Sequence, residues 1–240
     1  RLAVRIGLFY NRDIYAHAAL NQLVPKLIGH ELGMFYSQRV GSSSSKRDPR
    51  LMALAAVETD FTSAPGLSFD ALARASHCKE IAITDINNED RDVLREFNAD
   101  LVISIRFGQI FKAEAIALPR IGIINLHSGL LPEYKGVMAS FWSLLNNEPI
   151  LGTTLHWITD KHIDSGALIS TRSQSVTLGE TYLNQVLSLY RPGVSQICEA
   201  VDQIHSLAER KGGDLPAGSY YSFPTSADID RFLENGWRLF

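Results

Sequence analysis

The alternation of apolar runs with helical patterns is the feature that most constrains the fold of this 240-residue chain. Two patterns of buried strands, ADLVISIRFGQIF (99–111) and IGIINLH (121–127), flank the short helical pattern KAEAIAL (112–118). Nearly continuous apolar strands that alternate with helices are typical of parallel sheets covered on both faces. The sequence therefore predicts an α/β fold with a mostly parallel sheet flanked by helices.

Further segments extend this alternation along the chain. The additional strands are expected at residues 4–10, 31–41, 79–87, 152–158 and 166–176. The additional helices are expected from Ile14 onward and at residues 68–76, 88–97, 137–148, 181–190, 194–208 and 226–235. Proline cannot continue a regular helix, so Pro25 should kink or end the first helix, and Arg191, Pro192 and Gly193 predict a kink or a break. The serines at 42–45 indicate an exposed linker rather than a phosphate-binding loop.

The composition limits which kinds of binding partner and which cellular compartment are expected for this protein. The hydrophobic content of 45% and the formal charge of −3 give no general electrostatic reason to bind nucleic acid or anionic lipid, so a small molecule or a protein is expected. Cys78 and Cys198 have neither metal-like nor redox-like spacing, which favours a reducing compartment. No apolar run has the length of a membrane span, and the first residues do not resemble a signal peptide. We therefore predict a cytoplasmic protein.

Polar side chains with catalytic potential follow the apolar run at 121–127. Asn125 and His127 are two residues apart, so they share one face of the predicted strand at its carboxyl end, where parallel sheets bind ligands. His156 and Asp164 lie further along the chain. An amide can donate to an oxyanion, an imidazole can move protons or polarise a carbonyl, and a carboxylate can hold that imidazole. This set suits attack on a carbonyl group.

Other interpretations of the same residues are weaker. Ser128 is the nearest nucleophile for a serine triad, but no G-x-S-x-G elbow surrounds it. His156, Asp160, His162 and Asp164 could suggest zinc, but they have no recognised ligand spacing. A single histidine or aspartate is most often a satisfied structural group. The combined order and loop context of the set favour catalysis.

Two motifs in the middle of the chain resemble the signatures of the folate-dependent formyltransferases. NLHSGLLPEYKG (125–136) resembles N-x-H-x-S-L-L-P-x-Y-x-G, and TLHWITDKHIDSGALI (154–169) resembles H-x-V followed by D-x-G. The resemblance implies a Rossmann-like catalytic domain of the formyltransferase fold at residues 1–180, with C-terminal helices and an aromatic tail at 181–240 packed on it. It also implies transfer of a formyl group, without a metal, from the co-substrate N10-formyltetrahydrofolate to an amine or, in one branch, to water.

The resemblance assigns roles by position. Asn125, His127 and Asp164 would be the catalytic residues, and His156 would support them or serve only in packing. The residues that would contact the folate are Phe107, Gly108, Gln109, Ile110, Thr159, Asp160, His162 and Ile163. Ser128 and Gly129 depart from the usual Pro-Ser pair. The interval from His156 to Asp164 is one residue longer than in many members, which makes Asp160 a second candidate for the catalytic carboxylate.

The acceptor is expected to be the amine of a nucleotide-linked amino sugar, because YKGVMASFWSLLNNEP (134–149) most resembles the sugar N-formyltransferases. The chain lacks the length and positive charge expected for a tRNA substrate. Residues 8–23 lack the glycine turn of the glycinamide ribonucleotide enzymes, and no extra amino-terminal domain of the hydrolases precedes them. Another small amine and a catalytically silent folate-binding protein are the alternatives. The aromatic C-terminal third fits a homodimer interface or intramolecular packing equally well.

Overall fold

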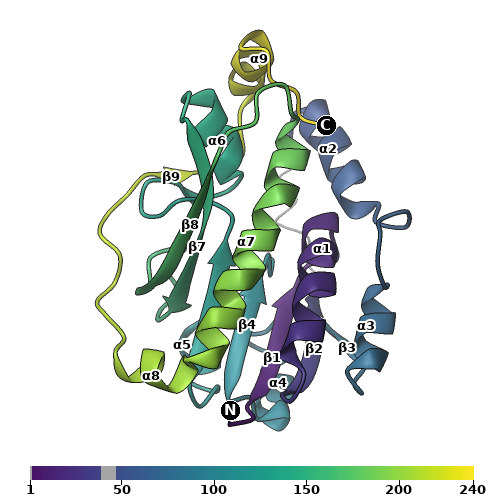
Figure 1. Ribbon diagram of the computed structural model, residues 1–240, viewed down its shortest axis with the longest axis vertical. Helices are drawn as coiled ribbons and strands as arrows, with labels where there is room; N and C mark the ends of the chain where they lie inside the picture. The colour runs from purple at the N-terminus through teal and green to yellow at the C-terminus, as the bar shows by residue number, and fades with distance from the viewer. Residues whose placement is uncertain (1, 39–46) are drawn as a thin grey trace.

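A computed structural model describes residues 2–38 and 47–240, so the serines at 42–45 lie outside the described residues. Within the described ranges a seven-stranded sheet has the order β3-β2-β1-β4-β5-β7-β8 (Figure 1). Its strands are β1 (Arg5–Tyr10), β2 (Glu31–Ser37), β3 (Glu80–Ile83), β4 (Leu101–Ile105), β5 (Gly122–His127), β7 (Ile150–Ile158) and β8 (Leu168–Ser175). A separate pair of short strands consists of β6 (Lys135–Gly136) and β9 (Tyr220–Tyr221).

Strand direction confirms the predicted sheet. The pairs β1–β2, β1–β4, β2–β3 and β4–β5 are parallel, whereas β5–β7 and β7–β8 are antiparallel. The five parallel strands therefore end at one common edge. In doubly wound sheets this carboxyl edge is where ligands bind.

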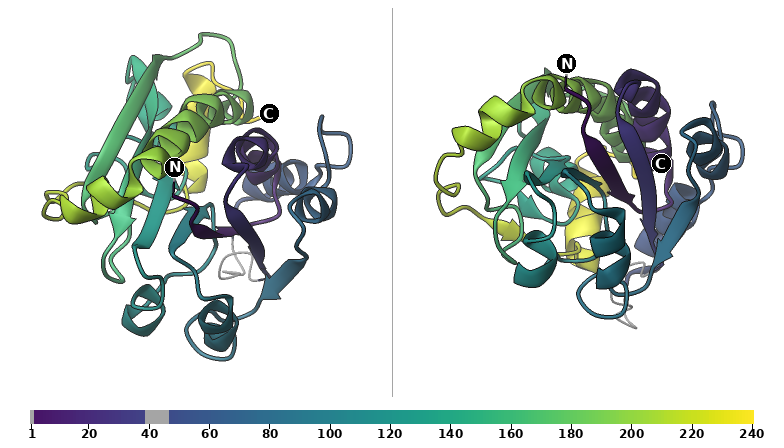
Figure 2. Two further views of the ribbon diagram at one scale, coloured as in Figure 1. Left: turned by 60° about the horizontal axis from the view of Figure 1, so that its bottom comes forward. Right: turned by 90° about the horizontal axis from the view of Figure 1, so that it is seen from below.

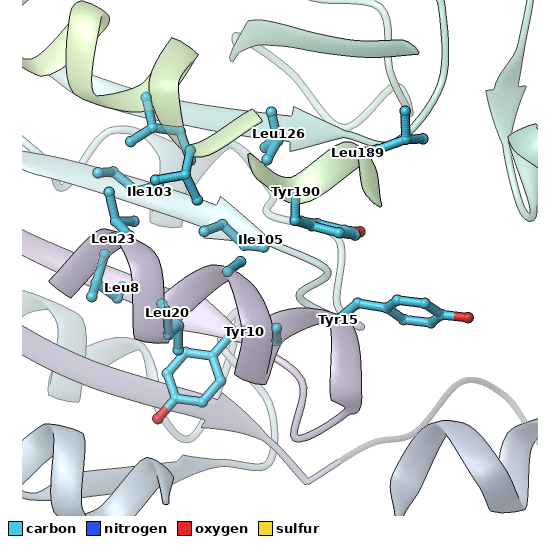
Figure 3. Close-up of a cluster of buried hydrophobic side chains, with 14 of the residues drawn as sticks. Leu8, Tyr10, Tyr15, Leu20, Leu23, Ile103, Ile105, Leu126, Leu189 and Tyr190 are labelled. Carbon is cyan, nitrogen blue, oxygen red and sulfur yellow. The ribbon is translucent and has the colours of Figure 1, made fainter. Parts of the chain in front are cut away.

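Helices cover both faces of the sheet, as expected (Figure 2). They are α1 (Ile14–Leu23), α2 (Pro49–Thr59), α3 (Phe69–Ala75), α4 (Arg91–Phe97), α5 (Ala113–Ile116), α6 (Ala139–Leu145), α7 (Tyr182–Asp202), α8 (Ile204–Glu209) and α9 (Ser226–Glu234). Helices α1 and α7 pack side by side on one face, where Figure 3 shows their leucines and tyrosines over the strands. Helices α4 and α5 cover the other face around a cluster that includes Phe9 and Phe35.

Two predictions about element boundaries need correction. The strand predicted at 99–111 ends at Ile105, because Arg106 has φ of 56°, in the left-handed region, which a strand cannot continue through. The predicted break at 191–193 does not occur, because α7 passes unbroken through Pro192. Gly193 lets α7 approach the sheet closely: a Cβ there would lie 2.7 Å from Leu126 Cδ2. Burial of this long helix offsets the one hydrogen bond that proline removes.

The other predicted helix end is confirmed. Helix α1 ends at Leu23, and the chain continues as a 3-10 helix, η1 (Val24–Leu27), with Pro25 in its first turn. Helix α2 was not expected, although Asp48 caps it and Pro49 occupies its first turn. No helix in the described ranges is both long and apolar enough to cross a membrane.

The C-terminal segment returns to the carboxyl edge of the sheet. After α8 it runs along the side of the molecule to β9, which pairs with β6, and it ends beyond α9 (Figure 1). The Tyr221 ring stacks on Tyr134 and on Trp142, with centroid distances of 5.4 and 5.0 Å. The tail thus packs directly against the loop that follows β5.

Candidate active site

A pocket of ≈ 630 Å³ opens at the carboxyl edge of the sheet. Residues that follow β1, β2, β4 and β5 line it, together with one side of α2, the amino end of α7 and Phe223 of the tail. Among the lining residues are Asn125, His127 and Asp164, which the sequence predicted as catalytic. The fold therefore brings the three predicted side chains into one pocket.

Strand pairing places the first two side chains. In β5, Asn125 pairs with Ser104 of β4 and with His156 of β7. His127 follows two residues later on the same face. Residues that lie opposite each other on neighbouring strands are close enough for their side chains to interact. His156 is therefore a direct neighbour of Asn125.

The His127 imidazole is buried between two acceptors. Its Nε2 lies 2.7 Å from the backbone oxygen of Tyr134, and its Nδ1 lies 3.4 Å from Asp164 Oδ2. A carbonyl oxygen and an ionised carboxylate can only accept hydrogen bonds. Both ring nitrogens of His127 therefore lie next to groups that can only accept hydrogen bonds.

His156 holds the Asn125 amide. Its Nδ1 lies 3.0 Å from the backbone oxygen of Trp157, so in the neutral ring this nitrogen carries the proton. The Nε2 atom then accepts a hydrogen bond from Asn125 Nδ2 at 3.2 Å, and it lies 3.5 Å from Asp164 Oδ1. His156 is buried, and its position fixes the orientation of the amide that faces the pocket.

The Asp164 carboxylate links the two histidines. Burial alone would raise its pKa, but the interactions with His127 and His156 and the hydrogen bond from the Gly136 N–H outweigh burial and lower the pKa of Asp164 to about 2. The Gly136 N–H donates to Oδ2 at 2.9 Å. The backbone of Asp164 has φ of 53°, in the left-handed region. At Gly166, two residues later, a Cβ atom would lie only 1.7 Å from the backbone oxygen of Trp157, so only glycine fits there. The D-x-G motif thus lets this loop close onto β7.

Six of the eight residues predicted to contact folate line one of two neighbouring pockets. Phe107 and Gly108 line the first pocket. A second pocket, of ≈ 760 Å³, is lined in part by Ile110, Asp160, His162 and Ile163. The same two loops line both pockets. Gly136 and Asp164 line the first pocket, and the residues directly before them, Lys135 and Ile163, line the second.

Two of the predicted folate residues make internal contacts instead. The Gln109 side chain donates to Ser37 Oγ and to the Ile83 oxygen and accepts from the Ile86 N–H, so it ties together the loops after β2 and β3. Thr159 Oγ1 donates to Asp214 Oδ1 at 3.0 Å. Neither residue lines either of these two pockets.

Asp160 is not placed beside His127. It is partly exposed and pairs with His162, with 2.9 Å between Asp160 Oδ2 and His162 Nδ1. Asp164 is therefore the carboxylate that the loop register brings to the two buried histidines. No cluster of three or more metal-binding side chains is found in the part of the chain that the structure describes.

Sequence reasoning missed one wall of the first pocket. Glu58 of α2, Arg106 after β4 and Tyr182 of α7 all line it. The Asp48–Pro49 start and the spacing of Leu51 and Leu54 could have predicted α2. Nothing in the sequence indicated that α2 would lie beside the ends of β1 and β4.

The strand order and the pocket at the carboxyl edge define the class: a Rossmann-like, doubly wound α/β protein with a ligand site at that edge. Comparison with known proteins gives the family, because residues 71–189, which include all three predicted catalytic residues, match the family model described as "Formyl transferase". This match confirms the resemblance read from the motifs.

Individual relatives agree with this result. A methionyl-tRNA formyltransferase from Geobacter metallireducens is 36% identical over 125 residues, which cover 50% of this chain and 39% of that protein. The chain therefore spans only about two fifths of this relative. The alignment with the sugar 3N-formyl transferase WlaRD covers 98% of this chain and 80% of the WlaRD chain. The sequence identity is 20% and the TM-score is 0.64. The alignment with glycinamide ribonucleotide transformylase 1 from Symbiobacterium toebii covers 90% of this chain and 95% of that protein. The sequence identity is 16% and the TM-score is 0.63. At these identities the two structures show a shared formyltransferase fold.

Proposed function

We propose that the protein transfers a formyl group from N10-formyltetrahydrofolate to a primary amine. The observation that carries this proposal is the convergence of Asn125, His127 and Asp164 on one pocket, with His127 held 3.4 Å from the Asp164 carboxylate. The match of residues 71–189 to the formyl transferase family supports it. The cytoplasmic location and a homodimer remain predictions from the sequence.

The geometry suits direct attack of the amine on the formyl carbonyl. Negative charge then develops on the formyl oxygen, where the Asn125 amide and the His127 imidazolium donate hydrogen bonds. Asp164 stabilises the imidazolium across the 3.4 Å contact. The amine loses its proton as it attacks, and the Asp164 carboxylate accepts that proton through water. The proton then passes to N10 as the bond between the formyl carbon and N10 breaks, so tetrahydrofolate leaves and the formyl group stays on the amine. No covalent intermediate with the protein is needed.

The two adjoining pockets fit a long donor molecule. The formyl group on N10 would lie in the first pocket beside His127, and one arm of the folate would extend past Gly108 and Ile110 into the second. Lys135 and Lys161 line the second pocket and supply positive charge for the carboxylates at the far end of a folate. The crystal structure of WlaRD was determined in the presence of dTDP and 5-N-formyl-THF, which supports a folate donor and a nucleotide-linked acceptor.

We propose an amino sugar carried on a nucleotide as the acceptor. The formal charge of −3 favours a small molecule over tRNA, the acceptor that the name of the Geobacter relative suggests. The residues after β1 are Asn11, Arg12 and Asp13, which do not form the glycine turn expected for a ribonucleotide phosphate. A folate-binding protein without activity is disfavoured because all three catalytic residue types are present.

A panel of acceptors tests the proposal. The purified protein and N10-formyltetrahydrofolate are incubated separately with several nucleotide-linked amino sugars, with glycinamide ribonucleotide, with ornithine derivatives and with methionyl-tRNA. Mass spectrometry then detects the added formyl group. We expect one formyl group on at least one nucleotide-linked amino sugar.

Each other outcome of the panel has a definite meaning. Formylation of glycinamide ribonucleotide or methionyl-tRNA alone would reject the sugar acceptor while keeping formyl transfer. Folate binding without turnover of any amine would reject the enzymatic proposal and favour the silent folate-binding protein.

A further inference from the structure

Arg106 forms a charged wall of the first pocket away from the Asp164 loop. It follows β4 and has a left-handed backbone conformation. Non-glycine residues in this conformation cluster at functional sites. Its Nε donates to Asp13 Oδ2 at 2.7 Å, and its guanidinium carbon lies 4.4 Å from the centre of the Tyr15 ring. Neither Nη atom makes a hydrogen bond of normal geometry to another described residue. Arg106 is thus fixed by one nitrogen and keeps two donor groups at the pocket.

Glu58 of α2 supplies an acceptor at the same wall. It lines the pocket, is partly buried and forms no ion pair within 4 Å in the described ranges. Burial raises the pKa of Glu58, while the nearby charge of Arg106 partly lowers it, so these two groups interact. The Tyr15 hydroxyl is buried without a hydrogen-bond partner, and Figure 3 shows it directed toward the carboxyl ends of the strands.

The charges at this wall favour a neutral ligand over an anion. Asp13 and Glu58 lie beside Arg106, whereas the other two arginines that line this pocket are engaged elsewhere, Arg12 with Glu80 and Arg47 over the Phe223 ring. A phosphate at Arg106 would therefore meet two carboxylates and one guanidinium. A hydroxyl group differs, because it accepts one hydrogen bond and donates another. Neighbouring hydroxyls on a sugar ring can each accept from Arg106 and donate to Glu58.

We propose that Glu58 and Arg106 form a subsite for the hydroxyl groups of a sugar ring in the acceptor. This inference rests on the proposed function and deepens it, because the subsite lies in the same pocket as His127. The sugar ring is held at this wall, and its amine then reaches toward Asn125 and His127. The charged wall selects a hydroxylated sugar ring rather than a phosphate at this position.

Direct binding tests the subsite without requiring turnover. The probe is the methyl glycoside of a 4-amino-4,6-dideoxyhexose, and saturation-transfer NMR measures its dissociation constant for the wild type and for Glu58→Gln. We expect about tenfold weaker binding in the variant, the size expected for a lost hydrogen bond to a charged group. Glu96→Gln, an exposed change on α4 across the sheet, is the matched control and should bind like the wild type.

Inorganic pyrophosphate is the second probe. We expect it not to compete with the glycoside, and Glu58→Gln should not weaken any binding that it shows. Arg106→Lys keeps the positive charge but loses the two-pronged donor, so it should also weaken binding of the glycoside. Thermal unfolding of each variant shows whether it remains folded.

Several results would overturn the subsite. These are no binding of the glycoside by the wild type, equal binding by the wild type and Glu58→Gln, and competition by pyrophosphate. Failure of the proposed function looks different: no acceptor in the panel is formylated, although the glycoside still binds in a Glu58-dependent way. Formylation of a nucleotide-linked sugar with undiminished glycoside binding by Glu58→Gln would retain the function and reject the subsite.

Discussion

Asp164 is the residue on which the electrostatics of the candidate site depend. Its carboxylate is buried, faces both His127 and His156, and accepts the Gly136 N–H. An ionised buried carboxylate is costly unless it is paired and hydrogen-bonded. These partners outweigh burial and lower the pKa of Asp164 to about 2, so the side chain stays charged at neutral pH.

This charge predicts how stability depends on pH. A carboxyl group whose pKa is lower in the folded state stabilises the fold above its unfolded value near 4, and that stability is lost as pH falls toward about 2. At pH 5 Asp164→Asn should therefore lower the free energy of unfolding by about 2 kcal/mol. The difference from the wild type should shrink progressively below pH 4.

Urea unfolding of both proteins between pH 5 and pH 2.5 measures this difference. Asp160→Asn in the same loop is the control, and its effect should be small because the Asp160–His162 pair is largely exposed. A difference between the wild type and Asp164→Asn that stays constant over the whole range would contradict the account.

At the level of elements, the loop between β5 and α6 sets the position of the imidazole. Gly129 lies where a Cβ would come within 2.5 Å of Ala139 Cβ in α6 and 2.6 Å of His127 Nε2 in β5. The departure from the usual Pro-Ser pair therefore falls at a point of close contact between a strand and a helix. A glycine here lets α6 approach His127.

Gly129→Ala tests this close contact. The added methyl group must displace the helix or the imidazole, so we expect a loss of about 1–3 kcal/mol in unfolding free energy and reduced formyl transfer. Gly212→Ala is the matched control, because a Cβ at Gly212 meets nothing within 4 Å. Urea unfolding and turnover are measured for both variants; equal behaviour would show that the contact is unimportant.

The strand and helix patterns predicted most elements because their periodicity reports local burial. The parallel sheet, the interruption at Pro25 and the shared face of Asn125 and His127 all followed from this periodicity. Local patterns do not report long-range packing. The unbroken helix at Pro192 depends on contact with Leu126, and the end of β4 depends on a left-handed residue that its apolar sequence did not indicate.

The sequence predicted the motif residues of the candidate site, but it did not predict the residues on the far wall of the pocket. The motifs located Asn125, His127 and Asp164, which the structure places in one pocket. Glu58 and Arg106 belong to no motif, and they meet only because α2 packs beside the ends of β1 and β4. The two residues are 48 positions apart in the sequence, so only the three-dimensional arrangement of the elements reveals that they line the same pocket.

At the scale of the whole molecule, the fold gathers two pockets and the C-terminal tail around one sheet edge. The β6–β9 pairing joins the tail to the loop that supplies Gly136 to Asp164, and Phe223 of the tail lines the first pocket. Donor and acceptor can therefore approach His127 from different pockets. In the proposed function His127 is needed for the chemistry, and most of the folate contacts are expected to come from other residues.

His127→Asn tests this central claim most directly. Formyl transfer and tetrahydrofolate binding are measured on the same preparation, with thermal unfolding as the check on folding. The account predicts that transfer falls at least about a hundredfold, the contribution of general acid–base and oxyanion groups, while the dissociation constant for tetrahydrofolate stays close to the wild-type value. Undiminished transfer by a folded His127→Asn protein would contradict it, and loss of folding would instead assign His127 a structural role.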